Sequence, residues 1–133
     1  MQLTTLTRLA AILSLCAASA AFAHHSNAMY ERTRTLDVTG TIREFQWTNP
    51  HTFIELTVDS ANGPQNFTIE GPTPGVLRAQ GWKFNSLKPG DKVVVKIHPL
   101  KEGRLGGGLI SVTMADGKIL PGGNAYAADK AGK

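Results

Sequence analysis

The chain has 133 residues, with 14 basic and 10 acidic side chains, a formal net charge of +4 and a single cysteine. This length suffices for one compact domain. The basic residues are scattered, with no run of five like charges and no interleaving with aromatic residues, so the composition argues against a nucleic-acid partner.

The first 23 residues are typical of a signal peptide. Arg8 is their only charge, the stretch from Leu9 to Phe22 is apolar or small, and Ala21 and Ala23 are the small residues that signal peptidase requires. The apolar stretch is shorter than the roughly 20 residues of a spanning helix. We therefore expect export to the periplasm, cleavage after Ala23 and no permanent membrane span; the alternative is an uncleaved N-terminal anchor.

The expected organisation is a signal peptide over residues 1–23, a single domain with an N-terminal arm over 24–120, and a flexible tail over 121–133. Cys16 leaves with the signal peptide, so the mature chain contains no cysteine and no disulfide. The domain must be held together by its hydrophobic core.

The first half of the domain has the pattern of three strands, at 36–47, 51–58 and 65–70. In the first, Val38 and Ile42 share a face and Phe45 departs from it, which indicates a bulge. The second alternates cleanly, with an inward face of Ile54, Leu56 and Val58 and an outward face of His51, Phe53, Glu55 and Thr57.

One short helix follows, with Thr73 as its cap, Pro74 in its first turn and Gly81 at its end. We expect Trp82 and Phe84, just beyond it, to pack against the barrel.

The second half has the pattern of strands at 92–98, 109–114 and 118–120. Residues 102–108 are rich in glycine and predict a flexible loop, while Asp116 and Gly117 predict a tight hairpin. Five or six short strands with one helix between the third and the fourth predict a mostly β, OB-like barrel. A small β-sandwich is the alternative.

Several motifs are shared with a known family: His24-His25-Ser26 after Ala23, Trp47-Thr48-Asn49-Pro50-His51, Ser86 to Asp91, His98 to Gly103, and Ala115 to Lys118. On these residues the chain resembles the small exported bacterial proteins called domain of unknown function 6152. The resemblance runs from His24 to about Leu120. It implies an exported protein with this fold and supplies no reaction.

The four histidines predict a metal site. Cleavage after Ala23 would leave His24 as the first residue, so its α-amine and its imidazole could chelate one ion. His51 or His98 would complete a set of three nitrogens that suits copper, and His25 is a further candidate. Glu55 and Glu70 could orient a ring or add a ligand, and Met29 is a soft donor for Cu(I). The predicted function is therefore metal handling by a periplasmic protein.

Other interpretations stay open. Each histidine, taken singly, also suits a structural role in a turn or at a strand end. A cut before Ala23 would place His24 second and His25 third, which makes a square-planar Cu(II) or Ni(II) motif instead. The outward face of His51, Phe53, Glu55 and Thr57 could serve a binding module for a small ligand or another envelope protein.

Catalysis has little support in the sequence. The mature chain has no cysteine nucleophile and no Gly-x-Ser-x-Gly motif. A copper ion held by His24 could carry out oxidative chemistry, by analogy with the histidine brace of polysaccharide monooxygenases.

Overall fold

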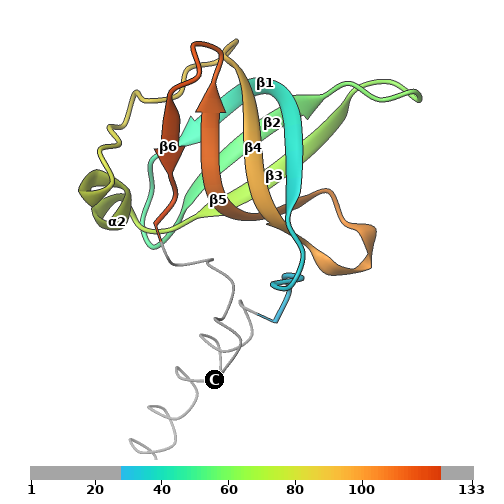
Figure 1. The fold of residues 1–133 in the computed structure, drawn as a ribbon, viewed down its shortest axis with the longest axis horizontal. Helices are drawn as coiled ribbons and strands as arrows, with labels where there is room; N and C mark the ends of the chain where they lie inside the picture. The colour runs from blue at the N-terminus through green and yellow to red at the C-terminus, as the bar shows by residue number, and fades with distance from the viewer. Residues whose placement is uncertain (1–27, 124–133) are drawn as a thin grey trace, which may run out of the picture.

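The structure, a computed structural model, describes residues 28–123. In this range the chain forms six strands, one short α-helix and one 3-10 turn (Figure 1): β1 Leu36–Gln46, β2 Thr52–Val58, β3 Gln65–Gly71, α2 Pro74–Ala79, β4 Lys92–Pro99, η1 Lys101–Gly103, β5 Gly106–Met114 and β6 Ile119–Pro121.

The strands are hydrogen-bonded in the order β3-β2-β1-β4-β5-β6, and β3 also pairs with β5. This last pairing is parallel and closes β1 to β5 into a barrel, with β6 as an additional strand. The order and the helix between β3 and β4 are those of an OB-type barrel. The predicted fold class is confirmed, and the β-sandwich alternative is wrong because the sheet closes on itself.

The core fills the barrel with one side chain from every second position of the strands. In β2, Ile54 and Leu56 are buried, whereas Phe53 and Glu55 on the opposite face are only half-buried. Burial of each aliphatic side chain stabilises the fold by about 1.5–3 kcal/mol. The buried cluster consists of Val38, Ile42, Ile54, Leu56, Ile69, Leu77, Trp82, Leu87, Val93, Val95, Ile97, Leu109, Val112 and Leu120.

A bulge in β1 keeps the core continuous. Ile42 and Glu44 pair with consecutive residues of β2, so Arg43 is an extra residue on the β1 side. The change of parity lets Phe45 pack against the core. The bulge predicted from the sequence is confirmed.

The glycine-rich segment closes the barrel instead of forming a loop throughout. Gly106, Gly107 and Gly108 begin β5 and pair in parallel with β3. A Cβ on Gly106 would lie 2.2 Å from the carbonyl oxygen of Thr68, and one on Gly107 would lie 2.3 Å from that of His98. The predicted flexible loop is therefore wrong over 106–108, because these glycines allow three strands to approach closely.

Helix α2 begins and ends as expected. The side chain of Thr73 accepts a hydrogen bond from the backbone of Val76 at 3.3 Å, and Pro74 stands in the first turn. Gly81 follows the helix with φ of 91°, a conformation that favours glycine. Leu77 is buried and joins the helix to the core.

Of the two aromatic residues after the helix, only one packs as expected. Trp82 is buried, and its Nε1 donates to the carbonyl of Pro121 at 2.8 Å. Phe84 is 71% exposed, so the expectation that it packs on the barrel is wrong. It lies in a turn in which the backbone N–H of Lys83 donates to the Ser86 hydroxyl at 2.8 Å, and the next core residue along the chain is Leu87.

The last described strand pairs with the second half of β5. The predicted hairpin at Asp116 and Gly117 is confirmed, with the backbone of Met114 donating to Lys118 at 2.8 Å. Strand β6 runs to Pro121, one residue beyond the expected end of the domain at Leu120. The rest of the predicted tail from residue 124, and the predicted signal peptide, lie outside the described residues. Within the described range, no helix has the length and apolar character needed to cross a bilayer.

Candidate functional site

The N-terminal arm is bound to the outside of the barrel where β4 ends. Tyr30 forms an isolated antiparallel bridge with Leu100, and the backbone of Glu31 donates to the carbonyl of Pro99 at 2.9 Å. Tyr30 is buried. This bridge and this hydrogen bond attach the described part of the arm, from residue 28, to the end of β4.

Glu70 links this arm to one of the predicted metal ligands. The hydroxyl of Tyr30 donates to Oε2 of Glu70, and Nδ1 of His51 lies 3.1 Å from Oε1 of the same carboxylate. The Glu70 side chain is only 17% exposed. One carboxylate thus holds both a phenol from the arm and an imidazole from the barrel.

The contacts of His51 determine which of its two ring nitrogens has a lone pair available to bind a metal ion. Its Nδ1 faces only acceptors, the Glu70 carboxylate and the Gly71 carbonyl oxygen at 3.4 Å. Nδ1 therefore carries a proton, and in the neutral ring the lone pair belongs to Nε2. The side chain is 39% exposed, so solutes can approach it.

The loop between β1 and β2 and the pairing of β2 with β3 build this corner. The hydroxyl of Thr48 donates to the carbonyl of His51 at 2.7 Å, which fixes the turn that enters β2. Phe53 of β2 pairs with Glu70 of β3, so the Glu70 carboxylate lies on the strand next to β2. His51, the residue just before β2, reaches this carboxylate through its Nδ1.

His98 occupies a different environment. It is 2% exposed, and its Nδ1 lies 2.7 Å from the carbonyl oxygen of Arg34 in the arm. A carbonyl can only accept, so here too Nδ1 carries the proton. The ring anchors the arm to β4.

The two histidines do not meet. Register pairing joins Glu70 to Gly108 and Gly108 to His98, so β2, β3, β5 and β4 are successive neighbours. By the other route β1 pairs with both β2 and β4, so His51, just before β2, and His98, in β4, belong to segments that do not pair with each other. Over residues 28–123, no three His, Asp or Glu side chains are grouped so that they could hold a metal ion.

The other predicted ligands either have contacts that do not involve His51 or lie outside the described residues. Glu55 faces outward from β2, where it pairs with Arg43 at 3.2 Å and accepts from the Thr68 hydroxyl at 3.0 Å. Met29 is in the arm and is partly exposed. The predicted ligands His24 and His25 precede the described range.

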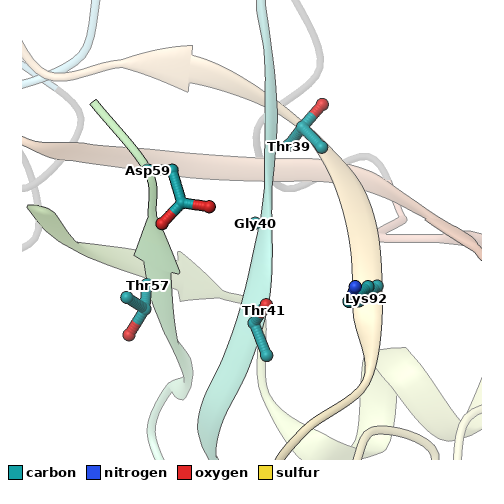
Figure 2. A pocket seen from close by; sticks show the side chains of 6 residues that line it. All are labelled: Thr39, Gly40, Thr41, Thr57, Asp59 and Lys92. Atoms are coloured by element: carbon teal, nitrogen blue, oxygen red, sulfur yellow. The ribbon is translucent and has the colours of Figure 1, made fainter. Parts of the chain in front are cut away.

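A polar hollow of about 370 Å³ lies elsewhere on the barrel wall, over β1, β2 and β4 (Figure 2). Thr41 is its centre, paired with Thr57 on one side and with Lys92 on the other. Asp59 and Lys92 lie on opposite sides of β1 in Figure 2. The hollow therefore offers hydroxyl groups between an acid and a base, and it includes Thr57 of the predicted outward face; its lining is Thr39, Gly40, Thr41, Thr57, Asp59 and Lys92.

Comparison with known proteins places the chain in a family. Residues 12–109 match the family of unknown function DUF6152. The chain is a member of this family. The match spans most of the chain and includes the arm, His51, Glu70 and His98. No curated protein and no solved structure matches it.

One residue at this corner of the DUF6152 protein, Tyr30, was not among the predicted site residues. Tyr30 is the only aromatic residue between His24 and Thr35, and a lone aromatic in a polar arm is a signal for a buried anchor. Its contact with Glu70 is set by strand pairing and could not be read from spacing. His51 and Glu70 were both predicted site residues, but which ring the carboxylate holds was left open until the structure showed it.

Proposed function

We propose that this protein binds a transition-metal ion, copper in the first place, in the periplasm and acts in metal handling. His51 is the barrel ligand, through Nε2, and His24 supplies its amine and imidazole after cleavage of the signal peptide. The observation that carries the proposal is the contact of His51 Nδ1 with Glu70. A carboxylate on one ring nitrogen, with the other accessible, is the usual arrangement of metal-binding histidines.

The arm supports the same arrangement. Tyr30 is fixed to the carboxylate that also holds His51, and His24 precedes it by six residues. Six residues reach at most about 20 Å. Only the Tyr30 side chain and the Glu70 carboxylate separate the arm from His51, and their combined length is less than this reach. The segment between His24 and Tyr30 is therefore long enough to bring His24 to His51.

The ligand chemistry favours copper. A set of nitrogen donors from an amine and two imidazoles binds Cu(II) more tightly than it binds the other divalent first-row ions. His98 is buried and faces the arm, so we assign it a role in the fold and keep His25 as the reserve ligand.

A copper titration of the exported, untagged protein tests the proposal, once mass spectrometry has confirmed His24 as the first residue. We expect one Cu(II) site tighter than micromolar, with nitrogen hyperfine structure in its electron paramagnetic resonance spectrum. His24→Ala should abolish the site and His51→Ala should weaken it at least about tenfold. Affinity weaker than micromolar in the wild type would refute the proposal.

Two carboxylates of the same barrel give a matched control. Glu70→Gln removes the charge that orients His51, whereas Glu55→Gln removes a charge that pairs with Arg43. We expect about a tenfold or greater loss of copper affinity in the first variant and none in the second. Equal losses in both would indicate a general effect of net charge.

A binding module without metal is the second candidate, and the polar hollow over β1 favours it. Its threonine hydroxyls with Asp59 and Lys92 would suit a small, uncharged or zwitterionic polar ligand. In that case Thr41→Val and Lys92→Gln should abolish ligand binding, while alanine at His24 and His25 leaves it unchanged.

A further inference from the structure

A second hollow lies at the end of the barrel where the arm, β3 and the segment between β4 and β5 meet. Its volume is about 160 Å³, and much of its wall is apolar, formed by Leu36, Phe67, Leu100 and Leu105. At about 30 Å³ per water molecule, this space holds roughly five waters or one small organic molecule. Leu105 remains 41% exposed beside it.

The charges around this hollow do not cancel. Arg34 pairs with Glu31 at 3.2 Å, so these two neutralise each other. Arg104 also lines the hollow, and among residues 28–123 it has no carboxylate within ion-pair distance. A guanidinium is a planar, permanently charged donor whose geometry matches a carboxylate. The hollow therefore combines an apolar wall with one uncompensated positive charge.

The segment that carries Arg104 is held in an unusual conformation. Glu102 has φ of 62°, the only positive value at a non-glycine position in the described range, and Gly103 follows at 68°. The left-handed region is unfavourable for glutamate, and such residues concentrate where a loop has a function. This turn leads directly into Arg104 and Leu105, which both line the hollow.

We propose that this hollow binds a small carboxylate with an apolar body. The carboxylate lies on the Arg104 guanidinium, and the apolar part packs against Leu105 and Phe67. A bare anion would leave the apolar wall unused, and a neutral apolar molecule would leave the arginine without a counter-charge. The site is separate from His51 and does not depend on a metal.

A titration with hexanoate tests this site. The processed protein is first treated with a chelator, and binding is monitored through the amide resonances in nitrogen–proton correlation spectra. We expect saturable shifts centred on Gly103, Leu105 and Gly106. Arg104→Gln should weaken binding at least about tenfold, since it removes a charge-assisted hydrogen bond. Arg78→Gln, the control, makes the same change in net charge at a residue that lies over Trp47, and should bind as the wild type does.

Two further compounds separate the parts of the proposal. Acetate lacks the apolar body and hexanamide lacks the charge, so each should bind at least about tenfold more weakly than hexanoate. Acetate that binds as well as hexanoate would reduce the site to a simple anion contact. Hexanamide that binds equally well, unsaturable shifts, or an unchanged affinity in Arg104→Gln would each overturn the proposal.

Discussion

His51 and His98 have similar sequence surroundings and different structural environments. Each stands beside a proline, His51 after Pro50 and His98 before Pro99, and each has Nδ1 against an oxygen acceptor. Yet the side chain of His51 is 39% exposed, while His98 is 2% exposed beneath the arm.

The difference shows that a hydrogen bond at Nδ1 does not by itself reveal whether a histidine is a metal ligand or a structural anchor. Both rings are fixed in the same tautomer, which suits either a metal ligand or a structural anchor. Accessibility separates the two roles. His51 can meet a solute, whereas His98 is surrounded by the chain, so we expect substitution to cost much more stability at His98 than at His51.

The largest effect on stability is expected in β5, whose first glycines lie close to the backbones of both β3 and β4. Gly107→Ala places a Cβ 2.3 Å from the His98 carbonyl oxygen, so the antiparallel pairing of β5 with β4 must shift. We expect the free energy of unfolding to fall by about 3 kcal/mol or more in urea denaturation. Gly117→Ala is the control, with open space and φ of 87°, and should cost about 1 kcal/mol. Equal costs would contradict the crowding argument.

Removal of the buried ring comes next. His98→Ala leaves a cavity and an unpaired carbonyl at Arg34, so we expect the free energy of unfolding to fall by roughly 2–4 kcal/mol in the metal-free protein. Urea denaturation measures it. A loss below about 0.5 kcal/mol, the range of surface substitutions, would show that His98 does not anchor the arm.

A smaller effect is expected at the contact that joins the arm to the His51 corner. Tyr30→Phe keeps the ring and removes the hydroxyl that donates to Glu70, which should cost about 1–2 kcal/mol. Hydrogen exchange at the Glu31 amide, which is bonded to Pro99, should become faster. Unchanged exchange at this amide would mean that the backbone bridge between Tyr30 and Leu100 holds the arm without the Tyr30 hydroxyl.

The smallest effect on stability is expected at the exposed ring. His51→Ala should change the free energy of unfolding of the metal-free protein by no more than about 0.5 kcal/mol, because its contact with Glu70 is partly solvated. The same urea denaturation compares it with His98→Ala. If the two variants were equally unstable, the assignment of separate roles would fail.

The sequence predicted most of the fold because local chemistry and the core pattern agree. Alternation placed Ile54 and Leu56 inside, the parity break before Phe45 indicated the bulge, and Thr73, Pro74 and Gly81 marked the helix. The glycines at 106–108 misled, because glycine is typical both of loops and of strands that crowd together.

The candidate site was only partly predictable. His51 and Glu70 were each recognised by residue type, but they are 19 positions apart, and their contact depends on the register of β2 with β3. Tyr30 was missed because its partner is 40 positions away. Such contacts depend on which strands pair, and residue spacing does not determine that pairing.

The sequence by itself determined the strand and helix pattern, the barrel class and the set of residues with ligand chemistry, because period and residue type act locally. Only the tertiary structure decided that Gly106 to Gly108 close the barrel, that His98 is covered by the arm, and that Glu70 joins Tyr30 to His51. These outcomes depend on contacts between distant segments, and a contact of that kind forms only once the strands are in register.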